Sequence, residues 1–430
     1  MEKNTLCNGE RGITLMALAI TIIVLMILAG VALNSIYGDT SVIENADRAT
    51  KEYNNSVVKG NEELGKMANM IKTDAPGIGD DDDDDSSILD GNGYLKQNYN
   101  YTSTTNSTLK ITIPKRFALL NASGAVVTSI EDYATTITDA NITANGIVVK
   151  AEDGSEFVWV PVADVNDSST GMCWTSGTRK VGQLYFDNSG NSFGTKRTQY
   201  QTNGGIGEAT TVDKDGGNDN TLVTGANSDA KKAATLEQFQ SEFEDMITSV
   251  ETYGGFYVGR YETSYINSKV KSVRTTSVDQ IMNAGEIRND APQNMGNWYG
   301  LYSKAKQYAS DAGVSNVVTS CMIWGCAYDQ IMLWMQANSI NVKNTDQTQG
   351  HYGSSYINTG SNDNYKFNNI YDLCGNYQEW TMTSMWSGRN LRGGNRTESG
   401  DKCALSSSEG VSPDAIKAEA TTRIQLFINI

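Results

Sequence analysis

The sequence predicts an α+β protein in which a transmembrane helix and a helical stem precede one large mixed domain. Residues 13–33 form a long apolar run without charge or proline. From residue 34 to 72, apolar residues recur every three or four positions along a charged segment. From residue 94 onward, short strand-like runs alternate with helix-like runs and long polar loops. These three patterns are typical of a spanning helix, an amphipathic helix and an α+β domain, respectively.

The apolar run has the length of a membrane anchor, because a helix that crosses the hydrocarbon core needs about 20 such residues. No small-residue cleavage site of the secretory type follows it, which argues against a removable signal peptide. Lys3 and Arg11 precede the run and Asp39 follows it. This charge distribution favours a single-pass protein of the cell membrane whose large domain lies outside the cytoplasm.

Arg11-Gly12 followed by Ile13 at the start of the apolar run resembles the processing site of type IV prepilins. The resemblance implies a leader of residues 1–12, cleavage after Gly12 and a mature chain that begins at Ile13. Pilins usually carry glutamate at the fifth mature position, where this chain has Ala17. The departure leaves the predicted anchor intact but weakens the case for assembly into a pilus.

The stem and the linker differ in composition. Residues 34–72 carry one apolar stripe, which fits either self-association in a coiled coil or docking on the chain's own domain. The stripe consists of Ile43, Ala46, Tyr53, Val57, Leu64, Met67 and Ile71. Residues 73–93 contain helix-breaking Pro76 and six consecutive aspartates, Asp80 to Asp85, and therefore predict an acidic, extended linker.

The large domain is predicted to span residues 94–430, with a polar insertion at about 164–230. Alternating and β-branched runs predict strands, and apolar residues with a period near 3.6 predict helices. The strands are expected at 109–113, 146–149, 156–160 and 254–264, and the helices at 234–250, 298–309 and 322–335.

Four segments in this order resemble the formylglycine-generating, sulfatase-modifying enzyme superfamily. They are Gly255 to Glu262, Met322 to Asp329, Ile370 to Trp380 with its Gly-Asn and Glu-Trp pairs, and Arg389 to Gly394. The resemblance covers about residues 108–430 and implies a C-type-lectin-like α+β fold whose final strand runs at residues 422–430.

The resemblance also implies two kinds of metal site. Enzymatic members hold copper(I) with two cysteines after the Arg-Gly-Gly element, and soft thiolates suit that ion. Here Cys403 is the only thiol in that stretch and Glu398 stands where the first cysteine is expected, so copper is not expected. Cys321 and Cys326 have the required gap but lie in another part of the pattern.

The family's calcium site, carried onto this chain, would use the side chains of Asp372 and Glu379 and the carbonyl groups of Gly375 and Tyr377. Calcium prefers six to eight oxygen ligands, and this set supplies part of such a shell. The alternative is that the two carboxylates only cap a turn. We expect a structural calcium ion.

A polar stretch after the Glu-Trp pair provides the predicted ligand-binding residues: Trp386, Arg389, Arg392, Arg396, Glu398 and Lys402. No residue is predicted to be catalytic, since the single histidine, His351, favours neither zinc binding nor nucleophilic catalysis. The net charge of −16 argues against nucleic-acid binding.

The sequence thus predicts a membrane-anchored, surface-displayed binding protein, adhesin-like or receptor-like, with an extracellular protein or glycan ligand. Two alternatives remain open. One is an oxygen-dependent enzyme of the sulfatase-modifying superfamily, and the other is a minor pilin or pseudopilin with a role in assembly.

Overall fold

The computed structural model describes residues 88–165, 174–175, 180–181, 236–283, 297–385, 388–399, 403–411 and 415–430. Residues 86–430 form a compact unit of their own, separate from residues 1–85. The predicted leader, span and stem, most of the linker and most of the predicted insertion therefore lie outside the described residues. Among the helices that are described, none is long and apolar enough to cross a membrane.

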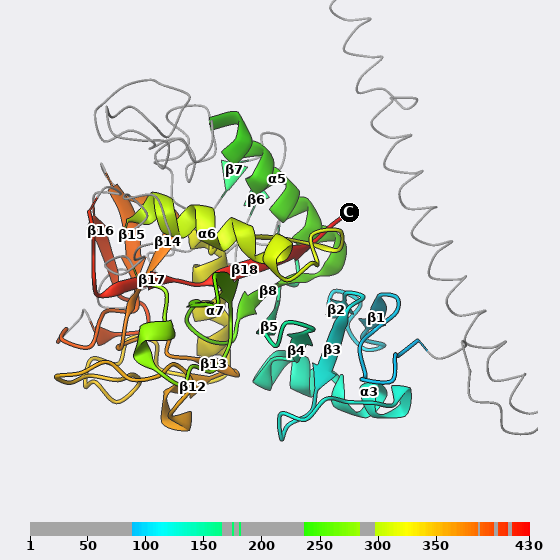
Figure 1. Ribbon diagram of the computed structural model, residues 1–430. Helices are drawn as coiled ribbons and strands as arrows, with labels where there is room; N and C mark the ends of the chain where they lie inside the picture. The colour runs from blue at the N-terminus through cyan, green and yellow to red at the C-terminus, as the bar shows by residue number, and fades with distance from the viewer. Residues whose placement is uncertain are drawn as a thin grey trace, which may run out of the picture. The chain divides into compact units, whose positions relative to one another are not determined.

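The described unit is a mixed α+β structure, as predicted, built around a six-stranded antiparallel sheet (Figure 1). The strand order is β11-β18-β8-β5-β4-β3. The last strand of the chain thus lies inside the sheet, between β11 and β8. In chain order the strands are β3 (Phe117–Leu120), β4 (Val148–Ala151), β5 (Glu156–Pro161), β8 (Gly255–Gly259), β11 (Val318–Met322) and β18 (Ile424–Ile428).

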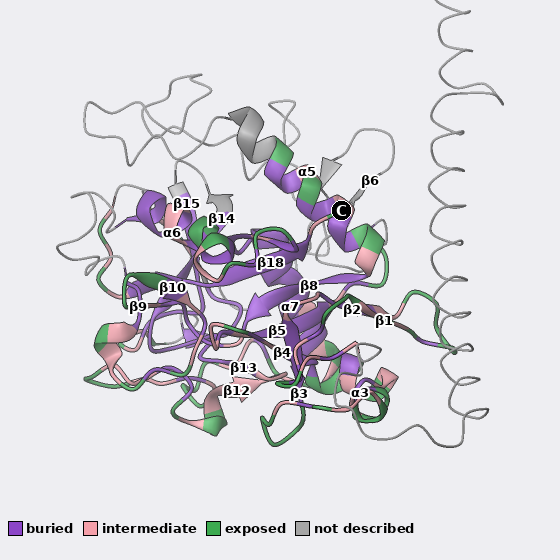
Figure 2. Cartoon of the chain, turned by 45° about the vertical axis from the view of Figure 1, so that its right-hand side comes forward, coloured by how far each residue is buried: buried purple, intermediate pink, exposed green. Residues whose placement is uncertain are grey.

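Each face of this sheet is covered by its own apolar cluster. Successive side chains of a strand point to opposite faces and therefore join different clusters. On β5, Val158 and Val160 join one apolar cluster, whereas Phe157 and Trp159 join the other. The first cluster contains side chains of the three long helices, and the second includes Tyr133 of a short helix. The helices are α3 (Ile130–Thr136), α5 (Leu236–Tyr253), α6 (Trp298–Asp311) and α7 (Gly325–Ala337). Figure 2 shows the strands of the sheet in the colour of buried residues, and α5 with buried and exposed residues along its length.

A second sheet of four strands carries the motifs of the C-terminal stretch, in the order β16-β15-β14-β17. The register between β14 and β15 shifts after Trp380, and β14 and β17 run parallel. Trp380 is fully buried beside α7 and joins the first apolar cluster. The strands are β14 (Gln378–Met385), β15 (Gly388–Arg392), β16 (Ser408–Val411) and β17 (Ala420–Thr422).

Smaller elements complete the described unit. The two-stranded sheets pair β1 (Tyr99–Thr102) with β2 (Lys110–Ile113), β6 (Trp174–Thr175) with β7 (Lys180–Val181), β9 (Ser264–Ile266) with β10 (Lys269–Lys271), and β12 (Lys366–Phe367) with β13 (Ile370–Tyr371). One π-helical turn, η1 (Asn141–Asn145), and two 3-10 turns, η4 (Val278–Gln280) and η5 (Asp363–Tyr365), lie in the loops.

One predicted boundary is wrong. The sequence predicts a helix over 322–335, but Met322 ends β11 and the helix begins at Gly325. The turn between the two elements is as apolar as the elements themselves. Trp324, at the helix start, makes no capping hydrogen bond through its side chain. Without a polar cap residue, the sequence carries no signal for the start of this helix.

Candidate functional site

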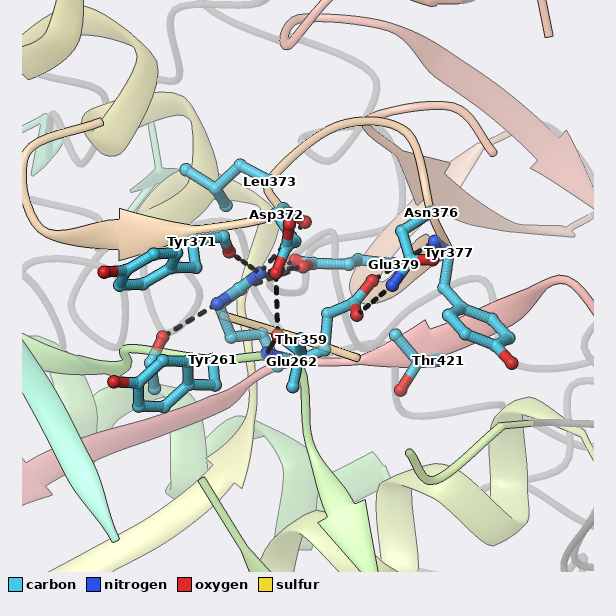
Figure 3. Close-up of polar contacts among 12 residues, drawn as sticks. Tyr261, Glu262, Thr359, Tyr371, Asp372, Leu373, Asn376, Tyr377, Glu379 and Thr421 are labelled. Atoms are coloured by element: carbon cyan, nitrogen blue, oxygen red, sulfur yellow. Dashed lines mark hydrogen bonds and ion pairs between the residues drawn. The ribbon is translucent and has the colours of Figure 1, made fainter. Parts of the chain in front are cut away.

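Arg423 lies at the centre of a fully buried polar cluster that joins both main sheets. Figure 3 shows three carboxyl groups of this cluster, those of Glu262, Asp372 and Glu379. The Nε atom of Arg423 donates to both carboxylate oxygens of Glu379, at 2.9 and 3.1 Å, and its Nη2 atom forms a further short contact with Glu379 Oε1. Both side chains have no exposed surface. Burial raises the pKa of the Glu379 carboxyl, and the charge of Arg423 opposes that rise.

The remaining donors of Arg423 are bound to main-chain carbonyl oxygens. Nη1 donates to Gly259 at 2.9 Å, and Nη2 donates to Tyr371 at 2.9 Å and to Asp372 at 3.3 Å. These carbonyl groups lie at the end of β8 and at and after β13, whereas Glu379 lies on β14. One guanidinium group therefore holds together segments that are far apart in the sequence.

Asp372 is held on the same cluster by the loop before it. Its Oδ2 atom accepts hydrogen bonds from Thr359 Oγ1 at 2.9 Å and from the Gly360 amide at 2.8 Å. Its Oδ1 atom is buried and has no partner among the described atoms. Burial raises the pKa of the Asp372 carboxyl, against the effect of those two hydrogen bonds.

Glu262 is the third carboxyl group of the cluster and was not predicted as a site residue. It accepts hydrogen bonds from Asn376 Nδ2 at 2.8 Å and from the Tyr377 amide at 3.2 Å. Burial raises the pKa of Glu262 well above its ordinary value, and Asp372 and Glu379 add to the rise. One arginine faces three buried carboxyl groups, so full ionisation of all three would leave unpaired negative charge out of water.

The predicted calcium ligands therefore lie together, but the donor set does not fit the ion in this arrangement. Arg423 binds both oxygens of Glu379, which leaves the predicted site without its second free carboxylate. Within the described ranges, no three His, Cys, Asp or Glu side chains gather in a way that could hold a metal ion. Calcium stays a prediction from the resemblance.

The predicted ligand-binding residues do not form one surface. Arg389 and Arg392 are only 1% and 0% exposed. Arg389 donates to the Met382 carbonyl at 2.7 Å and stacks on Trp298, and Arg392 pairs with buried Asp329 at 3.0 Å and stacks on Tyr328. Their prediction as ligand contacts is corrected: both cations fasten the second sheet to helices, and neither reaches solvent.

Arg396 and Glu398 are partly exposed, whereas Trp386 and Lys402 lie outside the described residues, as do Gly12 and Ile13. Arg396 stacks on Tyr356 at 4.4 Å, and Tyr356 in turn stacks on Tyr377 with ring centroids 4.1 Å apart and planes within 9°. We call Arg396, Tyr356 and Tyr377 the stacked ladder. Sequence reasoning missed Tyr356, because no motif marks a tyrosine in a polar loop.

Main-chain hydrogen bonds hold the loops that carry the ladder. The Arg396 amide donates to Asn376 and the Gly353 amide donates to Arg396, at 3.1 and 2.9 Å. The Asn376 amide donates to the carbonyl oxygen of His351 at 2.8 Å. The Arg396 guanidinium adds a bond of 2.9 Å to the Gly353 carbonyl. Residues 351–357 and 394–399 are thus fixed on the buried cluster through Asn376.

Two buried thiol groups donate to one loop of the fold. Cys374 donates to the Gln349 carbonyl at 3.2 Å and Cys403 donates to the Thr345 carbonyl at 3.1 Å, so both contact the same loop. Burial raises the pKa of Cys374, and the nearby Cys403 adds to the rise. The sequence predicts Cys403 as the only thiol after the Arg-Gly-Gly element, and in the structure Cys374, which is distant in the sequence, contacts the same loop. Cys321 and Cys326 are buried, on β11 and α7 respectively.

No protein-family model matches the sequence, and no curated protein matches it either. The solved structures that are similar include that of CarF, with 12% identity and a TM-score of 0.27 over 41% of this chain and 87% of that chain. They also include Treponema denticola variable protein 1, with 13% identity and a TM-score of 0.23 over 76% of this chain and 98% of that chain. Scores this low do not define a shared fold.

Proposed function

We propose that the chain is a membrane-anchored, surface-displayed binding protein. Residues 13–33 are its anchor, and residues 94–430 form a C-type-lectin-like domain that recognises a protein or glycan ligand outside the cytoplasm. The proposal combines the predicted anchor and the motif resemblance with one observation of the structure, the stacked ladder.

The ladder supports recognition because it is preorganised. Arg396, Tyr356 and Tyr377 are stacked, and the loops on which Arg396 and Tyr356 lie are cross-linked by main-chain hydrogen bonds. A loop that is already ordered loses less conformational entropy on binding. Tyrosine and arginine are also the side chains that contribute most often to the energetic centre of an interface.

The test is a binding screen of the full chain against immobilised glycans and extracellular proteins, followed by variants of the ladder. Tyr356→Ala and Arg396→Ala should each weaken binding of the ligand found by at least about tenfold, the range expected of interface anchors. Tyr101→Ala is the matched control, because Tyr101 is a partly exposed tyrosine on β1. Equal affinity in wild type and both ladder variants would exclude this site.

The thiol pair favours a second candidate, an oxygen-dependent enzyme of the sulfatase-modifying superfamily. Two soft donors, Cys374 and Cys403, suit copper(I) better than one. The bound ion would supply oxygen activation for the oxidation of a cysteine in a peptide. Titration of the full chain with copper(I) should then show one equivalent bound in wild type and a loss in Cys374→Ser. No uptake by wild type removes this candidate.

A further inference from the structure

Three cationic side chains surround a pair of stacked tyrosines away from the ladder. The rings of Tyr261 and Tyr371 lie 5.2 Å apart with planes within 21° (Figure 3). Arg260 lies 5.7 Å from the first ring centroid and 5.5 Å from the second. Arg274 and Lys366 each lie 5.5 Å from the centroid of Tyr371. We call Arg260, Arg274 and Lys366 the cation cluster.

The carboxylates nearby do not neutralise the cation cluster. Glu156 accepts from Arg260 at 2.7 Å, and Asp363 pairs with Lys366 at 3.3 Å. Three cations thus face two carboxylates. The whole chain has a net charge of −16, so its composition alone would predict negative charge here, not an excess of positive charge. Positive potential at such a place attracts anions.

Two arginines of the cation cluster have N–H groups available for a further hydrogen bond. Arg274 is an exposed residue, and its Nη2 atom donates to the hydroxyl oxygen of Tyr371 at 3.2 Å. No carboxylate of the described residues forms an ion pair with Arg274. The Nε atom of Arg260 is buried without a hydrogen-bond partner among the described atoms. Buried donors are normally satisfied, so an orphaned one indicates a missing partner.

The tyrosines fix the cluster rather than contact a ligand. Tyr371 is 1% exposed, and its hydroxyl group donates to Asp363 Oδ1 at 2.6 Å. Burial and that hydrogen bond raise the pKa of Tyr371 to about 12, so the group stays a neutral donor near neutral pH. Tyr261 donates to Glu156 at 3.3 Å. Around the two tyrosines, Arg274 and Asp363 are exposed and Lys366 is partly exposed.

We propose that the cation cluster is a binding site for an oxyanion group of a ligand, with Arg274 as the main contact. A guanidinium group presents paired N–H donors that match the geometry of carboxylate, sulfate and phosphate oxygens. Lys366 adds a point charge, and Asp363 is the exposed carboxylate with which the ligand competes. This inference stands apart from the proposed function, since no residue of the stacked ladder takes part.

Equilibrium dialysis of the full chain with labelled sulfate, and separately with labelled phosphate, tests the site at constant ionic strength set with chloride. We expect saturable binding of one equivalent. Acetate as a competitor distinguishes a carboxylate site from one that needs a tetrahedral anion. Arg274→Gln should weaken the affinity about tenfold or more, because it removes a charge-assisted contact.

The controls separate a site from general charge. Lys269→Gln makes the same change in net charge on an exposed lysine of β10, outside the cluster, and should leave binding unchanged. Arg274→Lys should retain part of the affinity, because charge remains without the fork. Unfolding of Arg274→Gln is checked by its melting temperature. Wild-type binding no stronger than that of chloride, or an equal loss in Lys269→Gln, would overturn the proposal.

Discussion

Glu379 and Arg423 form a fully buried ion pair that links strand β14 to the residue before the last strand of the chain. The pair is bidentate, and the other donors of the arginine reach three carbonyl groups. This guanidinium is buried and each of its nitrogen atoms has a partner, so it acts as an internal cation. It holds Glu379 and the turn after β13 together.

Removal of the internal cation should be severe. Arg423→Met leaves the Glu379 carboxylate and the Gly259 and Tyr371 carbonyl groups buried without their donor, which typically costs about 3–5 kcal/mol. Urea unfolding followed by tryptophan fluorescence measures this cost. Arg116→Met is the control, because Arg116 and Glu152 form a partly exposed pair worth about 1 kcal/mol or less. Adding Glu379→Gln to Arg423→Met should restore part of the lost stability. Equal losses in Arg423→Met and Arg116→Met would contradict the role of Arg423 as an internal cation.

The carboxyl group of Glu262 should make stability depend on pH in an unusual direction. Its pKa is raised in the folded state from an ordinary value of 4.5, so the folded chain holds a proton that the unfolded chain releases. The free energy of unfolding from this group is therefore highest below the unfolded pKa and falls as pH rises through the folded pKa. Glu262→Gln should reduce the decline measured between about pH 5 and pH 8. An unchanged slope in this variant would show that Glu262 is ionised.

Calcium should have little effect on the stability of this chain. A ligand stabilises the folded state only if it binds there, and Glu379 is bound by Arg423. Addition of calcium, or its removal with a chelator, should shift the melting temperature by less than about 1 °C. Magnesium at equal concentration controls for ionic strength. A calcium-specific rise of several degrees in the melting temperature would show that the chain binds the calcium ion predicted from the resemblance.

Local patterns predict much of this fold, because they depend on near neighbours in the sequence. The helices α5 and α6 and the strands β5 and β8 lie within a few residues of their predicted positions. The second sheet was not predicted as a sheet, since pairing between β14 and β17 joins segments about 40 residues apart, and no local signal encodes such a partner.

The candidate site was predicted only in part for the same reason. Asp372 and Glu379 follow from their motif, but Arg423 lies just before the final strand and Glu262 in another segment. One signal was available: Arg423 is the single charge in an otherwise uncharged run, residues 420–430, and a buried charge needs an opposite charge nearby. The burial of Arg389 and Arg392 was not predictable, since nothing local distinguishes a buried arginine from an exposed one.

Gly393, the first glycine of the Arg-Gly-Gly element, should be required both by its backbone conformation and by close packing. Gly393 and Gly124 have the same φ of +82°, a conformation that costs other residues about 1 kcal/mol or more. A Cβ atom at Gly393 would lie 2.1 Å from the Leu373 carbonyl oxygen, whereas one at Gly124 would meet nothing within 4 Å. Gly124→Ala should therefore cost about 1 kcal/mol and Gly393→Ala at least about 3 kcal/mol in urea unfolding. Because the backbone penalty is shared, the difference isolates the contact that fixes β15 against the turn carrying Asp372. Similar costs at the two positions would mean that this turn can move, and with it the carbonyl groups that bind Arg423.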